Sequence, residues 1–150
     1  MKKILAFLAV ASIIGFSENS SAKQTRGLTE KNKIIVHMKH FTDDLHTAYM
    51  ALELADRLQC HGAKVTFLFD LEGVRFADGE SGSARIRGPG ERSFSEIFDA
   101  FIKGGGQGLV CNHCAEHSGI NKDQIRKGVE SASMDKIAEA ILAADKIVEY

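Results

Sequence analysis

Short apolar runs rich in β-branched residues alternate with amphipathic segments along most of this chain, and that alternation limits the folds open to it. The runs at residues 33–38, 65–69, 108–111 and 146–150, with a weaker one at 129–131, have the length of buried strands. Between them, apolar residues recur every three or four positions, which is the helical period. Strands that alternate with helices predict an α/β domain with a mostly parallel sheet and helices on both faces.

Two of the predicted helices have clear boundaries. Acidic residues at 43–44 can cap a helix whose apolar stripe runs from Leu45 to Leu58 and which ends at Gly62. The sequence Ser93-Phe-Ser-Glu96 is a capping box at the start of a second helix. Shorter helices are predicted after Cys111, after Asn121 and over 134–144, and residues 70–92 are predicted to form a long loop.

The first 22 residues predict a secretory signal peptide. Two lysines precede a 13-residue apolar run at 4–16, and Ser20-Ser-Ala22 has the small residues of a cleavage site. The run is shorter than the roughly 20 residues that span a bilayer, so an uncleaved membrane anchor is the less favoured alternative. We therefore predict export to the periplasm with no membrane attachment after cleavage, a flexible linker at 23–32, and one domain at 33–150.

Charge and cysteine content limit the possible partners. A formal net charge of −1 argues against an electrostatic surface for nucleic acid. Three cysteines are an odd number for an exported chain, which meets an oxidising compartment. A Cys111–Cys114 disulfide is the simplest pairing, and it leaves Cys60, which is expected to be a partly buried structural thiol.

The sequence Cys111-Asn-His-Cys114 holds the most reactive chemistry in the chain. It follows an apolar strand, so Cys111 is placed where a strand passes into a helix. A thiol there faces the unpaired N–H groups of the first helical turn, which favour the thiolate. His113 and His117 flank the thiols as a candidate base or as groups that tune their pKa.

Other chemistry is possible for the same residues. Cys111, Cys114 and His117 have the spacing of zinc ligands on one helical face, and one further histidine (His37, His40 or His113) could complete the set. A thioredoxin fold is disfavoured because the motif comes late and the single proline precedes it, although dithiol redox chemistry on another fold stays open. His37 itself lies inside a predicted strand and is expected to be a packed core or oligomer residue.

Several segments together resemble the DsrE/TusD-type sulfur-relay proteins. In that family a persulfide-carrying cysteine ends a strand eight residues before a glycine, and Cys111 and Gly119 match this spacing. The Ala-x-x-x-Ala-x-x-Leu-x-x-x-Gly pattern at 51–62, the segment 67–74 and the ending 144–150 are similar to other parts of the family pattern. The resemblance spans residues 33–150.

This resemblance implies a three-layer, flavodoxin-like fold with about five strands, and a homo-oligomer, a trimer or hexamer. It implies transfer of sulfane sulfur between donor and acceptor thiols or proteins, with a persulfide on Cys111 and no cofactor. Cys114 is then a resolving thiol, and His113 and His117 tune the pair. Two alternatives stay open: a periplasmic thiol-disulfide redox protein that uses both cysteines, and a metal-binding or small-ligand-binding oligomer without catalysis.

The chain departs from the family pattern in two respects. Many relatives carry arginines just before the glycine, whereas Glu116-His-Ser118 stand here, so His117 is the candidate replacement for an anion-stabilising arginine. The family's relay to tRNA thiolation is cytoplasmic, and an exported protein cannot take part in it. The donor and acceptor expected here are therefore periplasmic.

Overall fold

Five parallel strands form a single sheet with the order β4-β3-β2-β1-β5 in the computed structural model, which describes residues 32–88 and 90–150. The strands are β1 (Lys33–Met38), β2 (Lys64–Phe69), β3 (Gln107–Cys111), β4 (Val129–Ala132) and β5 (Lys146–Glu149). The parallel sheet of about five strands predicted from the sequence is confirmed. The predicted signal peptide and all of the predicted linker except its last residue lie outside the described residues.

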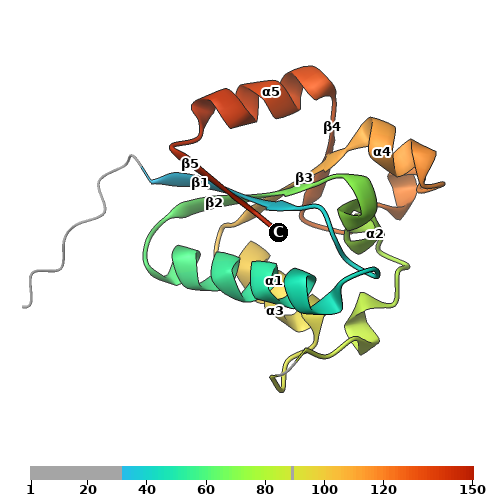
Figure 1. Cartoon of the computed structure of the whole chain (residues 1–150), viewed down its shortest axis with the longest axis horizontal. Helices are drawn as coiled ribbons and strands as arrows, with labels where there is room; N and C mark the ends of the chain where they lie inside the picture. Colours follow the sequence, from blue (N-terminus) through green and yellow to red (C-terminus); the bar gives the residue numbers. More distant parts are fainter. Residues whose placement is uncertain (1–31, 89) are drawn as a thin grey trace, which may run out of the picture.

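Helices cover both faces of the sheet, as predicted (Figure 1). Helices α1 (Leu45–Cys60) and α3 (Phe94–Lys103) pack on one face, and α5 (Met134–Ala143) packs on the other. Two short helices, α2 (Val74–Ala77) and α4 (Asn112–His117), lie near each other at the carboxyl ends of the strands. Three 3₁₀ turns complete the fold: η1 (Leu71–Gly73), η2 (Ser83–Arg85) and η3 (Lys122–Gln124). No helix within the described ranges is both long enough and apolar enough to cross a bilayer.

The larger core lies under α1 and α3 and is built around phenylalanines. Phe98 is fully buried at its centre, and its ring lies 5.3 to 5.9 Å, centroid to centroid, from four other phenylalanine rings: Phe67, Phe69, Phe76 and Phe101. A smaller apolar cluster under α5 contains Ile35, Leu68, Leu109, Cys111, Ala132 and Ile137. Successive strand residues alternate between the two clusters, because their side chains point to opposite faces of the sheet. Cys111 therefore faces α5.

The segment 70–92 differs from its prediction as one long loop. It contains η1, α2 and η2. Val74, Phe76 and Ala77 are fully buried, so tertiary packing stabilises a helical turn that is too short to show a period in the sequence. The helix predicted after Asn121 forms only the single turn η3, and Cys60, expected to be partly buried, is exposed at the end of α1.

Side-chain contacts of Arg126 link the segment around η2 to the rest of the domain. Its Nη2 donates hydrogen bonds to the hydroxyls of Ser83 at 3.0 Å and Ser95 at 2.9 Å. Its guanidinium carbon lies 4.4 Å from the centroid of the Phe76 ring, which is the geometry of a cation–π contact. Burial lowers the pKa of Arg126 from its ordinary value. The guanidinium of Arg126 therefore donates to two hydroxyls and lies on a ring face, while the charges of Asp78 and Asp99 act on it electrostatically.

Candidate functional site

Cys111 occupies the strand-to-helix junction that the sequence predicts. It is the last residue of β3 and the N-cap of α4. Its Sγ accepts a hydrogen bond from the backbone N–H of Cys114 at 3.4 Å. The chain therefore provides Cys111 with one of the N–H donors expected at the start of a helix.

The two thiols of the motif differ in accessibility. Cys111 is only 3% exposed in the single chain, so its expected accessibility is not observed there. Cys114 is half-buried, packs against the apolar clusters on both faces of the sheet, and is free, as is Cys111. Cys114 is thus the thiol that a reagent from solution meets first.

A surface hollow of about 470 Å³ opens beside Cys114. It brings both candidate histidines to the half-buried thiol, together with residues from the segment after β2. Its lining residues are Leu71, Glu72, Arg75, His113, Cys114, His117 and Ser118. Arg75 Nε lies 2.9 Å from Glu72 Oε1, so a guanidinium is present in the hollow but is paired with a carboxylate. The hollow contains the predicted residues His113, Cys114 and His117, while Cys111 lies behind Cys114.

The surroundings of Cys114 favour its protonated form. Burial raises the pKa of the Cys114 thiol, and a hydrogen bond with Cys111 and the charge of Asp70 raise it further. The backbone N–H of Leu71 acts in the opposite direction. Leu71 has a φ of 46°, in the left-handed region that side-chain-bearing residues rarely adopt. A strained residue in contact with a thiol is typical of functional sites.

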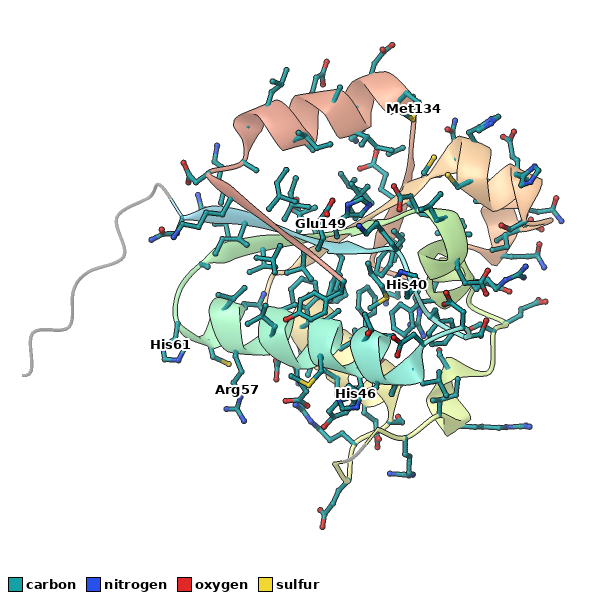
Figure 2. All side chains as sticks on the ribbon, viewed as in Figure 1. His40, His46, Arg57, His61, Met134 and Glu149 are labelled. Atoms are coloured by element: carbon teal, nitrogen blue, oxygen red, sulfur yellow. The ribbon has the colours of Figure 1, made fainter. Side chains whose placement is uncertain are left out.

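A histidine–carboxylate array lies beside the thiols, and sequence analysis missed it. His37 Nε2 lies 2.8 Å from Asp70 Oδ1, and His37 Nδ1 lies 3.4 Å from Glu149 Oε1. Burial alone lowers the pKa of His37, but its contacts with these two carboxylates outweigh burial and raise the pKa above its ordinary value. Figure 2 shows Glu149 on the sheet, whereas His46, Arg57 and His61 point outward along α1.

Strand register places Asp70 beside Cys111. Phe69 of β2 pairs with Val110 of β3, so the next residue of each segment, Asp70 and Cys111, are neighbours across the sheet. Asp70 follows the strand in an extended conformation, so its side chain points to the same face as Leu68, which is the face of Cys111. The sequence places Asp70 at the end of a predicted strand, and the pairing of β2 with β3 was needed to bring this carboxylate to Cys111.

The alternative metal set is not assembled. Cys111, Cys114 and His117 share α4 and its cap, but His117 is exposed and Cys111 is buried. Within 32–88 and 90–150, no three histidine, cysteine, aspartate or glutamate side chains are gathered as metal ligands would be. The geometry of these residues does not fit a tetrahedral site.

A larger cavity of about 810 Å³ lies under α5, at the amino ends of the strands. Its floor includes Ile35 and Leu109, and its rim includes Lys33, Lys64 and Glu139. None of the thiol-site residues lines it. The thiols lie at the carboxyl ends of the strands, where sites in parallel α/β sheets usually lie.

Gly73 packs against the backbone of β1 and helps to position the segment that lines the hollow. A Cβ at this position would lie 2.0 Å from the carbonyl oxygen of Met38. We expect Gly73→Ala to lower the free energy of unfolding by about 3 kcal/mol, because backbone atoms cannot move aside as a side chain can. Chemical denaturation would measure the loss.

Gly104→Ala is the matched control for Gly73→Ala. Its added Cβ would lie 2.7 Å from Gln59 Oε1, which is the end of a flexible side chain. We expect a change of less than about 1 kcal/mol for this variant. Equal losses for the two variants would contradict the close backbone approach at Gly73.

Comparisons with a family model and with solved structures agree on the fold of this chain. The DsrE/DsrF-like family model matches residues 31–150. The structure is similar to that of the ychN protein from E. coli, at 19% identity and a TM-score of 0.62, over 80% of this chain and 99% of that chain. It is also similar to MTH1491, a protein of unknown function from Methanobacterium thermoautotrophicum, at 13% identity and a TM-score of 0.60, over 79% and 98%. No curated protein matches the chain.

Proposed function

The chain belongs to the DsrE/DsrF-like family, and from this membership we propose that it handles sulfane sulfur through a persulfide on Cys111. The family points to sulfur relay in general. The observation that supports the carrier residue is the position of Cys111 at the end of β3, where its Sγ accepts the Cys114 N–H. This is the strand-end position that the family pattern gives to the persulfide cysteine.

The proposed transfer needs no oxidant beyond the donor itself. The Cys111 thiolate attacks the outer sulfur of a donor persulfide and forms a new S–S bond. The donor's S–S bond breaks, and its electron pair leaves with the inner sulfur as a thiolate. An acceptor thiolate then attacks the outer sulfur of Cys111 in the same way, which restores the Cys111 thiolate.

Cys114 offers a second outcome for the bound sulfur. As a resolving thiol, Cys114 attacks the inner sulfur of the Cys111 persulfide, forms a Cys111–Cys114 disulfide and releases hydrosulfide. The sulfane sulfur is reduced to sulfide in this step while the two cysteines are oxidised. His113 and His117 are proposed to tune the pair, because both line the hollow onto which Cys114 opens.

The proposal also includes the localisation and the oligomeric state of the protein. We propose an exported protein that meets donor and acceptor thiols or proteins in the periplasm, as a trimer or hexamer of identical chains. The sequence at 1–22 supports export, and the resemblance to the DsrE/TusD-type proteins implies an oligomer. Fractionation of the native host and light scattering of the purified chain would test these two points.

Loading with a sulfane-sulfur donor tests the carrier role. The reduced chain, with residues 1–22 removed, is incubated with inorganic polysulfide and its intact mass is measured. We expect one added sulfur atom per chain, and peptide mapping after thiol blocking should assign it to Cys111. Loading confined to Cys60, which is exposed and lies outside the site, would contradict the proposal.

Thiol–disulfide exchange is a second candidate function, favoured by one observation. Cys111 and Cys114 are both free and share a hydrogen bond, so they are close enough to act as a dithiol. A glutathione redox titration followed by thiol labelling would measure the potential of the pair, and insulin reduction would test activity. Insulin reduction by a chain that takes up no sulfur from polysulfide would favour this function over sulfur transfer.

A further inference from the structure

His37, Asp70 and the two thiols of the motif form a continuous array on the α5-facing side of the sheet. Asp70 directly follows the last residue of β2, Phe69, whose partner Val110 directly precedes Cys111, and it contacts His37 Nε2 at 2.8 Å. Asp70 also acts electrostatically on Cys114. This carboxylate is therefore the link between an imidazole on one strand and the thiols on another. Neither the persulfide transfer nor the resolving step described above uses the imidazole.

We propose that the His37–Asp70 pair adjusts the protonation of the Cys114 thiol, so that its reactivity falls less steeply with falling pH near neutrality than that of an isolated thiol. As an account of how sulfur transfer is regulated, this inference rests on the proposed function. The electrostatic effect of the pair on Cys114 applies to any reagent that reacts with this thiol. Asp70 and His37 are positioning residues in this arrangement, since His37 acts through Asp70.

The physical basis is the charge that the thiol faces. When His37 is neutral, the negative charge of the Asp70 carboxylate has no compensating cation at His37, and it opposes formation of the Cys114 thiolate. When His37 is protonated, the ion pair cancels most of that charge. A free thiol loses about tenfold in thiolate for each unit of falling pH well below its pKa. Protonation of His37 over the same range offsets part of that loss.

Other charged groups lie on both sides of this array. Glu149 contacts the second ring nitrogen of His37, and Lys39 Nζ lies 3.1 Å from Glu149 Oε2. On the thiol side, the titratable and charged groups are Cys111 and Cys114 themselves and four residues of the hollow: Glu72, Arg75, His113 and His117. Glu149 has the half-buried Lys39 as its own partner, so the buried end of the array is the contact between His37 and Asp70.

The test measures the alkylation rate of Cys114 by iodoacetamide from about pH 5.5 to pH 9.5, a range that spans histidine titration. The Cys60→Ser background removes the exposed thiol outside the site, and peptide mass spectrometry reads Cys114 alone. We expect Asp70→Asn to raise the rate severalfold near pH 9, where His37 is neutral and the Asp70 charge opposes the thiolate, and to raise it less near pH 6, where protonated His37 already cancels most of that charge.

His37→Gln should have the opposite and pH-dependent effect. We expect it to slow alkylation severalfold near pH 6, where the wild-type imidazole is protonated, and to leave the rate near pH 9 unchanged. In the Asp70→Asn background, His37→Gln should have little effect, because His37 acts through the carboxylate. A merely structural role for either residue would not produce opposite signs or a pH-dependent difference.

A second histidine–aspartate pair provides the matched control. His40 Nδ1 lies 2.6 Å from Asp43 Oδ2 in the exposed segment before α1. His40→Gln and Asp43→Asn remove the same chemistry there and should leave the alkylation profile unchanged. The inference is overturned if Asp70→Asn fails to accelerate alkylation, or if His37→Gln acts equally near pH 6 and near pH 9.

The inference and the proposed function fail in different measurements. If polysulfide loads no sulfur onto Cys111 while the alkylation profiles shift as expected, the proposal of sulfur transfer is wrong and the proposed effect of His37 and Asp70 on Cys114 is confirmed. If loading succeeds while Asp70→Asn and His37→Gln leave alkylation unchanged, the proposed effect of His37 and Asp70 on Cys114 is wrong and the proposal of sulfur transfer is supported. Circular dichroism of each variant confirms that the rates refer to folded protein.

Discussion

Replacement of Cys111 by serine is expected to abolish the stable sulfur adduct on this protein without unfolding it. A hydroxyl cannot hold a sulfane sulfur as a persulfide, so the adduct at position 111 should be lost completely, which peptide mapping after polysulfide treatment and thiol blocking measures. The fold should tolerate the change, because Cys111 is the N-cap of α4 and serine is a preferred N-cap residue. The serine hydroxyl can accept the Cys114 N–H that the thiol now accepts.

Two further cysteine variants give this experiment its controls. Cys60→Ser should load sulfur on Cys111 as the unsubstituted chain does, because Cys60 is at the end of α1 and lies outside the thiol site. Cys114→Ser should accumulate more adduct, because it lacks the resolving thiol. An adduct on Cys114 in the Cys111→Ser variant, in the same yield as in the unsubstituted chain, would assign the carrier role to Cys114.

Phe98→Ala is expected to lower the free energy of unfolding by about 4 kcal/mol, the loss typical of a fully buried phenylalanine. Phe98 is the centre of the larger core, where four other phenylalanine rings contact it. The Arg126 guanidinium also lies 5.1 Å from the centroid of its ring. Truncation therefore leaves a cavity and removes one of the two ring faces beside a buried cation. Urea denaturation followed by circular dichroism measures the loss.

Two further variants serve as controls for the stability loss of Phe98→Ala. Phe98→Leu keeps most of the volume and should cost no more than about 2 kcal/mol. Leu142→Ala removes an apolar side chain that is 86% exposed on α5, and it should change stability by less than about 0.5 kcal/mol. A loss below about 1 kcal/mol for Phe98→Ala would mean that this core is not packed around the ring.

The sequence predicted the parts of the fold in which burial is periodic. The strand at 33–38 matches β1 at both ends, and the capping box at Ser93 opens α3 as expected. The segment after β2 could not be predicted in the same way. Helix α2 is a single turn, and the observation that explains it is the contact of Val74 and Phe76 with the core, which is a tertiary interaction.

The thiol site, like the segment after β2, could be predicted only in part, because some of its features depend on tertiary contacts. Cys111 at the end of its strand follows from local sequence, and so does the position of Cys114 one turn later. The accessibility of each thiol does not, because it depends on α5 and on the segment that carries Leu71. His37 and Asp70 are 33 positions apart in the chain and become neighbours only through strand pairing. Their contact is therefore visible only once the order of the strands is known.

The attachment of η2 by Arg126 has a consequence for experiments in acid. Serine hydroxyls and phenyl rings carry no ionisable proton between pH 3 and pH 9, and guanidinium keeps its charge throughout that interval. Acid neutralises Asp78 and Asp99, whose charges act on Arg126, but it leaves the hydroxyl and ring contacts of Arg126 in place. Acid titrations of the thiols can accordingly be interpreted without a simultaneous detachment of the segment that Arg126 secures.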